Sequence, residues 1–194
     1  MNLIIDIGNT CIKLVAFRDG EIMEEKRISH TDIDALRGFV AAYPFDKGIV
    51  SSVVDLPDAM KDALADIDIR MMQLESGITR VPINILYNTP HTLGADRLAG
   101  AVGAMCETPG RNLLIIDVGT CITYDVVTAK GDYLGGNISP GPKMRFKALH
   151  DYTSRLPLVE RQGDCPEIGY DTETAMRSGV IVGVEHEMSG YIAR

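Results

Sequence analysis

Short apolar runs separated by turn residues open the chain, at the spacing of β-strands. They predict three strands, over residues 2–5, 13–18 and 22–28. The dipeptide Asp19-Gly20 is typical of a tight hairpin turn between the last two strands. Apolar positions after Thr31 recur at helical spacing, so we expect an N-capped amphipathic helix that ends near Pro44.

Strands and helices then alternate, which favours an α/β layer fold. We expect a strand, a helix with proline in its first turn and another strand, over residues 48–54, 57–67 and 69–72. Small apolar residues from Ala95 to Cys106 predict a buried helix, which Gly110 closes.

The second half rebuilds the three-strand opening of the first. Its predicted strands cover residues 113–116, 122–127 and 133–134. A helix through His150 follows the Pro-Gly-Pro of residues 140–142, and a long helix runs from Thr172 to Arg194. The chain stops inside that last pattern without a stop signal, so we expect that its C-terminal end is truncated.

One stretch of sequence occurs twice. LIIDIGNTCI at residues 3–12 matches LIIDVGTCI at residues 114–122 with a single one-residue gap. Each copy places an aspartate at the end of a buried strand, followed by a glycine and a hydroxyl residue. Glycine lets the backbone approach a phosphate, and a nearby carboxylate suits a hydrated Mg²⁺. The repeated motif therefore predicts two phosphate-binding hairpins. A common Asp-x-Gly turn is the structural alternative for either copy alone.

Charge and composition exclude several function classes. The 194 residues carry 19 basic and 27 acidic side chains, a net charge of −8, with no basic stripe, so we expect no nucleic-acid partner. Four cysteines without a C-x-x-C pair argue against structural zinc and favour a reducing cytoplasm. No apolar run reaches the roughly 18 residues of a membrane span, and the first residues do not read as a signal peptide.

Four motifs together resemble a known family. DIGNTCIK at residues 6–13, LGADR at residues 93–97, DVGTCITYD at residues 117–125 and GGNISPG at residues 135–141 are similar to the motifs of type III pantothenate kinases, within the actin, heat-shock ATPase and sugar kinase superfamily. The resemblance implies two related α/β lobes, residues 1–111 and 112–194, each opening with a β-hairpin phosphate loop, with the nucleotide in the cleft between them.

The resemblance also implies roles for individual residues. Asp96 would be the catalytic proton acceptor, Asp117 would place a monovalent cation, K⁺ or NH₄⁺, and Asp6 would act through Mg²⁺ and its waters. The residues implied to bind ATP and its phosphates are Asp6, Ile7, Gly8, Asn9, Thr10, Cys11, Ile12, Lys13, Gly119 and Thr120. Those implied to bind pantothenate are Tyr87, Gly94, Ala95, Asp96, Arg97 and Thr172.

From the residues alone, structural alternatives stay open for four of these positions. Asp96 could interact with a helix dipole, Lys13 could face solvent, Tyr87 could be a strand-edge aromatic and Thr172 a helix N-cap.

The activity implied is transfer of the ATP γ-phosphate to the primary hydroxyl of pantothenate, giving 4′-phosphopantothenate, the first step towards coenzyme A. The family also implies a cytoplasmic homodimer. Two other functions are open at this point. One is a kinase of the same superfamily with another small-molecule acceptor, and the other is a regulatory or binding protein that keeps the fold without catalysis.

Overall fold

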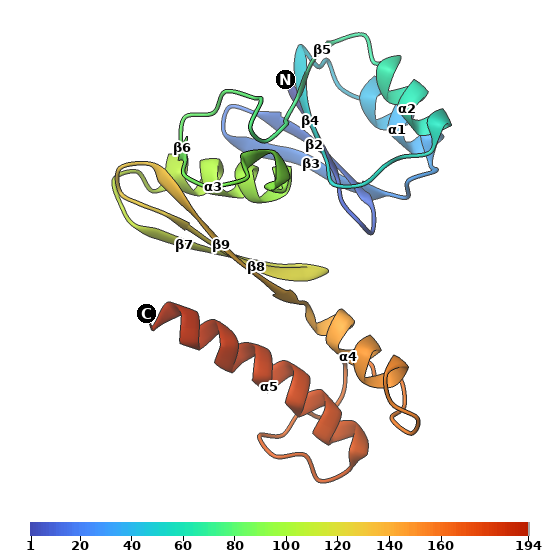
Figure 1. Ribbon diagram of the computed structural model, residues 1–194. Coiled ribbons are helices and arrows are strands. Elements are labelled where there is room, and N and C mark those ends of the chain that lie inside the picture. The colour runs from blue at the N-terminus through green and yellow to red at the C-terminus, as the bar shows by residue number, and fades with distance from the viewer. Residues whose placement is uncertain (194) are drawn as a thin grey trace. The chain divides into compact units, whose positions relative to one another are not determined.

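The computed structural model describes residues 1–193 of the chain, which form two compact units that divide between Gly103 and Ala104 (Figure 1). The division falls within one helix, α3 (Ala95–Glu107). Among the described residues, no helix is long and apolar enough to cross a membrane.

The first unit contains a five-stranded mixed sheet in the order β3-β2-β1-β4-β5. The strands are β1 (Asn2–Ile7), β2 (Ile12–Arg18), β3 (Glu21–Ile28), β4 (Lys47–Ser52) and β5 (Arg70–Gln73). β1 pairs antiparallel with β2 and parallel with β4, so the meander of the first three strands continues into a parallel half. The hairpin between β2 and β3 turns at Asp19 and Gly20, whose φ angles of 51° and 88° suit the predicted tight turn.

Two helices cover one face of this sheet, α1 (Ile33–Ala41) and α2 (Asp58–Ala65) (Figure 1). Alternate residues of β1 point into the core that they form, because side chains alternate faces along a strand. The fully buried members are Leu3, Ile5, Ile12, Leu14, Ala16, Leu36 and Met60. Asp32, rather than Thr31, caps α1, since its carboxylate accepts the Ala35 N–H at 3.0 Å.

The remainder of the first unit holds short elements that the sequence pattern did not predict. They are β6 (Asn84–Ile85) and the 3₁₀ turn η1 (Pro90–Thr92). α3 follows at the expected position but is buried on one side only. Its buried residues are Ala95, Arg97, Leu98 and Ala101, whereas Ala99, Gly100 and Gly103 are exposed.

The second unit opens with an antiparallel meander followed by two helices. The strands are β7 (Leu113–Val118), β8 (Cys121–Val127) and β9 (Asp132–Pro140), and the helices are α4 (Pro142–Asp151) and α5 (Thr172–Ile192). β9 is longer than the predicted strand of residues 133–134, because the glycines at 135 and 136 continue it. A side chain at Gly136 would meet the Tyr124 carbonyl oxygen, so this strand position requires glycine.

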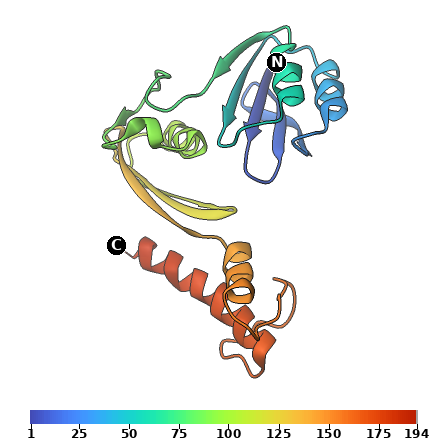
Figure 2. The same cartoon turned by 45° about the vertical axis from the view of Figure 1, so that its right-hand side comes forward.

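Two apolar clusters hold α5 against α4 and against β8. Phe146 of α4 packs with Met176 and Val180, and Figure 2 shows the two helices side by side. Val184 packs against Ile122 and Tyr124 of β8. The Tyr191 ring stacks on Tyr124, with centroids 3.9 Å apart. The predicted continuation of this helix to Arg194 lies outside the described residues.

Candidate active site

The aspartate of the first repeated motif lies between two strands that present polar side chains to it. Asp6 is the register partner of Lys13 on β2 and of Ser51 on β4. Lys13 Nζ lies 3.7 Å from Asp6 Oδ2, and the Ser51 hydroxyl donates to Asp6 Oδ1 at 3.2 Å. The Asp6 and Lys13 side chains are 37% and 38% exposed, so carboxylate and ammonium remain accessible to a ligand. Sequence analysis did not single out Ser51, whose position depends on the parallel pairing.

The turn of this hairpin is closed by a backbone bond from the Gly8 N–H to the Cys11 carbonyl at 3.1 Å. Asn9 and Thr10 are exposed at the tip. His30, in the turn before α1, contacts the Gly8 carbonyl through Nε2 at 2.8 Å. A histidine 22 residues away therefore fixes the turn, and nothing in the local sequence indicates that contact.

The second hairpin repeats the first in its backbone. The Gly119 N–H donates to the Cys121 carbonyl at 2.9 Å, as Gly8 does to Cys11. Asp117 faces Thr123 across the strands, whereas Asp6 faces Lys13. The one-residue gap between the two motifs thus lies in the turn, and the flanking strands keep the same register.

The end of β9 lies directly on this second turn. The Gly141 N–H donates to the Thr120 carbonyl at 3.0 Å, and Pro140 is the register partner of Cys121. A Cβ at position 141 would lie 2.4 Å from the Gly119 oxygen and 2.5 Å from that of Thr120. Gly141, the last glycine of the GGNISPG motif, is therefore required for contact with the hairpin.

A polar cluster holds the same strand end from the other side. The Glu187 carboxylate of α5 accepts hydrogen bonds from the Tyr124 hydroxyl, at 2.8 Å, and from the Ser139 hydroxyl. It also forms an ion pair with Arg145 of α4. Arg145 also donates from Nε to the Pro140 carbonyl at 2.7 Å.

The pKa values of Glu187 and Tyr124 in this cluster shift in opposite directions. Burial by itself would raise the pKa of Glu187, but hydrogen bonds from Arg145, Ser139 and Tyr124 outweigh it and hold the pKa below its ordinary value. Burial and then the bond to Glu187 raise the pKa of Tyr124 to about 12. The carboxylate therefore stays ionised and the phenol stays neutral at ordinary pH.

The candidate proton acceptor stands at the N-terminus of α3. Asp96 is exposed, and its Oδ1 accepts the Arg97 N–H at 2.8 Å. A side chain at Gly94 would come within 2.4 Å of that oxygen, so glycine leaves room for the carboxylate. Arg97 is buried, with 8% exposed. Tyr87 is half-buried in the segment between β6 and η1.

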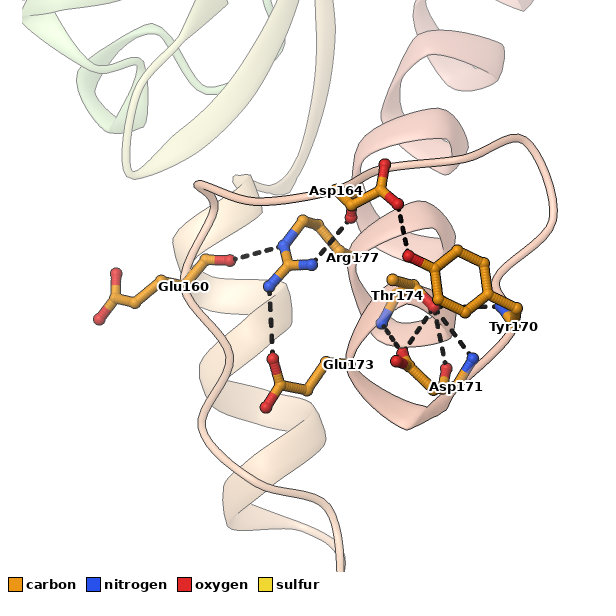
Figure 3. Close-up of polar contacts among 7 residues, drawn as sticks. All are labelled: Glu160, Asp164, Tyr170, Asp171, Glu173, Thr174 and Arg177. Carbon is orange, nitrogen blue, oxygen red and sulfur yellow. Dashed lines mark hydrogen bonds and ion pairs between the residues drawn. The ribbon is translucent and has the colours of Figure 1, made fainter.

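Thr172 is the first residue of α5 and is exposed, but it is not the cap. Asp171 is the N-cap, and it forms a capping box with Thr174 (Figure 3). Arg177, with 6% exposed, donates to the carbonyls of Glu160 and Asp164 and holds the preceding loop against the helix (Figure 3).

The sequence-predicted residues divide between the two units. The first unit holds the Asp6–Lys13 hairpin, Tyr87 and the residues at the start of α3, and the second holds the Asp117–Thr120 hairpin and Thr172. Within the second unit, Thr172 lies on α5 and lines a groove together with Arg145 of α4. It precedes Glu187 by 15 positions on one helix, or about 22 Å at 1.5 Å per residue.

The first hairpin fits a hydrated divalent cation better than a protein-enclosed one. Residues 1–193 contain no group of three or more His, Cys, Asp or Glu side chains that could hold a metal ion. Mg²⁺ usually binds one or two carboxylates together with substrate phosphates and retains several waters. An accessible Asp6 carboxylate beside a phosphate-type turn fits that mode.

Comparison with known proteins identifies the family of the chain. The family model described as type III pantothenate kinase matches residues 2–194. A protein of Phocaeicola vulgatus named type III pantothenate kinase is 50% identical over 192 residues, which cover 99% of this chain and 79% of that protein. A protein of the same name from Bacteroides fragilis is 47% identical over 193 residues, covering 100% of this chain and 79% of that protein.

Solved structures extend the likeness to the fold. A Campylobacter jejuni protein provisionally described as a Baf family transcriptional activator superposes with a TM-score of 0.59 at 19% identity, over 97% of this chain and 78% of that one. A Sinorhizobium meliloti protein provisionally described as a 2-dehydro-3-deoxygalactonokinase gives 0.53 at 14% identity, over 100% of this chain and 82% of that one. At these identities the likeness shows the fold alone, an α/β fold with one sheet in each unit, as predicted. The near-complete family match and the relatives at 47% and 50% identity establish that the chain belongs to the type III pantothenate kinase family.

Proposed function

We propose that this chain transfers the γ-phosphoryl group of ATP to the primary hydroxyl of pantothenate and so produces 4′-phosphopantothenate, the first step of coenzyme A biosynthesis. The observation that carries the proposal is the repeated hairpin, in which a Gly N–H to Cys carbonyl bond closes the same turn in both units. The family resemblance implies that two such turns bind one polyphosphate, and Asp96 offers an exposed carboxylate to the acceptor.

The two turns would hold ATP by backbone N–H groups and by hydroxyls at their tips. In the first hairpin residues 6–13 would bind ATP, Ile7 and Ile12 through their backbone because their side chains are buried in the core. Lys13 is the cation nearest the Asp6 carboxylate. In the second, Gly119 and Thr120 form the tip. Asp6 would hold Mg²⁺ through its waters, and bound Mg²⁺ would offset charge on the phosphates.

We further propose that Asp117 places a monovalent cation, K⁺ or NH₄⁺. Its partner across the hairpin is Thr123, where the first hairpin has Lys13 opposite its aspartate. The protein itself therefore supplies a fixed ammonium beside Asp6, and a neutral hydroxyl residue beside Asp117. An exchangeable cation beside Asp117 would restore the missing positive charge.

The acceptor would bind at the start of α3. Phosphoryl transfer demands mainly alignment and compensation of charge, and proton removal from the attacking hydroxyl comes late. Asp96 would take that proton, because its carboxylate is exposed and is oriented by the Arg97 N–H. Arg97, Tyr87 and the backbone of Gly94 and Ala95 would bind pantothenate, and Thr172 would complete the pocket.

We also propose that the active form is a cytoplasmic homodimer. Support comes from the groove between α4 and α5, whose lining includes Leu149, Met176 and Val180 together with Thr172. Thr172 lies in that groove, 15 positions before Glu187 on α5, and a second copy of the chain that packs into the apolar groove would cover it. Light scattering coupled to size-exclusion chromatography measures the oligomeric state. A monomer at the assay concentration would contradict the proposed homodimer.

The deciding experiment incubates the chain with ATP, Mg²⁺ and pantothenate, in KCl or in NaCl, and follows pantothenate by mass spectrometry. We expect a mass gain of one phosphate that requires ATP and is greater in KCl. A sugar, acetate and pantothenate with its primary hydroxyl blocked serve as control acceptors. Phosphorylation of another acceptor in preference to pantothenate, or no product from folded protein, would contradict the proposal.

A further inference from the structure

We propose that Arg145 and Glu187 form a positioning pair that fixes the second phosphate hairpin for ATP, which rests on the function proposed above. Neither residue belongs to the repeated hairpin or to the acceptor motif. Both lie on helices, α4 and α5, and meet at the end of β9.

The pair is connected to the hairpin by an unbroken series of contacts. Arg145 donates from Nε to the Pro140 carbonyl at 2.7 Å. The next residue, Gly141, donates its N–H to the Thr120 carbonyl at 3.0 Å. Thr120 is at the tip of the hairpin, so the guanidinium acts on this turn through two consecutive residues of the chain.

Glu187 holds the guanidinium in that place. It forms the ion pair with Arg145 and accepts hydroxyl protons from Ser139 on β9 and Tyr124 on β8. β8 is one strand of the hairpin and β9 is its neighbour in the sheet. Arg145 also donates to Ser139 at 3.2 Å. The carboxylate thereby joins α4, α5, β8 and β9 at one point.

The position of Glu187 on α5 is what suggests a role beyond stability. Val180, Val184 and Tyr191 pack on the same side of the helix, at helical spacing, and Glu187 lies among them. An apolar residue there would extend the packing against Tyr124, and replacing a partly buried ion pair by apolar groups is often neutral or stabilising. Arg145 and Glu187 side chains are only 23% and 24% exposed, so the pair is desolvated without being required for packing.

The test compares Glu187→Gln, Arg145→Gln and the double variant with the full chain. Glu185→Gln is the matched control, because Glu185 lies two residues away on the same helix and is exposed. KM for ATP, KM for pantothenate, kcat and thermal midpoint are measured for each. Binding of Mg·ATP to the protein without pantothenate is measured by calorimetry.

We expect each single variant to raise KM for ATP and the calorimetric Kd by roughly tenfold, the equivalent of one charge-assisted hydrogen bond. KM for pantothenate should change less than KM for ATP, since Tyr87 and residues 94–97 lie on other elements and Thr172 lies 15 positions before Glu187 on α5. The double variant should be no worse than the single variants, because two residues that act as one unit are not additive. Glu185→Gln should behave as the parent chain.

Unchanged ATP affinity in folded Glu187→Gln and Arg145→Gln would overturn the proposal, even if their thermal midpoints fell. Arg145→Lys keeps the charge but loses the fixed geometry of the Nε donor to Pro140, so it should weaken ATP binding with little loss of stability. Failure of that conservative variant to fold would also overturn the proposal, because the pair would then hold the unit together. The calorimetric measurement of Mg·ATP binding needs no phosphate acceptor. A wrong acceptor in the proposed function would therefore not affect this test of the Arg145–Glu187 pair.

Discussion

Lys13 lies opposite Asp6 across the first hairpin, with its Nζ 3.7 Å from Asp6 Oδ2. The second hairpin has Thr123 at the equivalent place opposite Asp117. Two copies of one motif therefore differ at the position that decides the local charge. The first turn therefore has a positively charged side chain opposite its aspartate, and the second has a neutral one.

Lys13→Gln should weaken ATP binding, because it removes the fixed positive charge beside the first phosphate turn. We expect KM for ATP to rise by roughly two- to fivefold, the effect of one solvent-screened ionic contact of about 0.5–1 kcal/mol. Lys26→Gln on the exposed strand β3 is the control. Equal ATP affinity in the two variants would place Lys13 outside the nucleotide site.

Asp96→Asn should leave Mg·ATP binding intact and lower kcat by about 10² to 10⁴, the usual contribution of a general base. Asparagine keeps the size and the bond from the Arg97 N–H but cannot accept the proton. Asp34→Asn, also an acidic residue in the first turn of a helix, is the control. Steady-state kinetics with both substrates decides, and turnover near that of the parent chain would remove Asp96 from the base role.

Gly141→Ala should damage the second hairpin, because the added methyl would lie 2.4 Å from the Gly119 oxygen and 2.5 Å from that of Thr120. The strand end or the turn must shift, and we expect a loss of about 1–3 kcal/mol in unfolding free energy together with weaker ATP binding. Urea unfolding and calorimetry measure the two effects.

Gly38→Ala in α1 is the counterpart with the opposite expected sign. No atom lies within 4 Å of a Cβ added there, and the residue is exposed within the helix. It should stabilise the chain by about 0.5–1 kcal/mol. Loss of stability in this variant, or none in Gly141→Ala, would contradict the steric argument.

Tyr124→Phe should reduce the alkaline loss of stability. The pKa of Tyr124 is raised in the fold from 10.0 to about 12, so the folded chain holds a proton that the unfolded chain releases in that window. Stability contributed by the neutral phenol is therefore complete below pH 10 and is lost as the pH rises towards 12. Urea unfolding of the parent chain should show a decline there that is smaller in Tyr124→Phe, because the raised pKa values of Tyr43 and Tyr170 remain. Tyr152→Phe, at a residue 88% exposed, should keep the decline.

Arg177→Met should loosen the loop before α5. Its guanidinium donates to the Glu160 and Asp164 carbonyls at 3.1 and 2.8 Å, and methionine would leave both acceptors without that partner (Figure 3). We expect a loss of about 2–4 kcal/mol, and faster proteolysis in that loop than in the parent chain. Arg155→Met, at an exposed position, is the control. An unaltered cleavage rate would show that the apolar packing of α5 holds the loop by itself.

Much of the fold could be predicted because its elements carry local signals. Short apolar runs predicted β1, β2, β7 and β8, and the Asp19-Gly20 turn was confirmed by two positive φ angles. β9 was predicted too short, because glycine and proline ordinarily interrupt strands. The close approach of Tyr124 to Gly136 explains the exception, and it depends on pairing with another strand.

By itself, the sequence determined that two similar hairpins exist and which aspartates end their strands, since both properties depend on a few consecutive residues. Only the tertiary structure decided which distant side chains reach them. His30 contacts Gly8 across 22 residues, and Glu187 contacts Ser139 across 48. Such contacts are set by strand pairing and helix packing rather than by local pattern, so no short stretch of sequence specifies them.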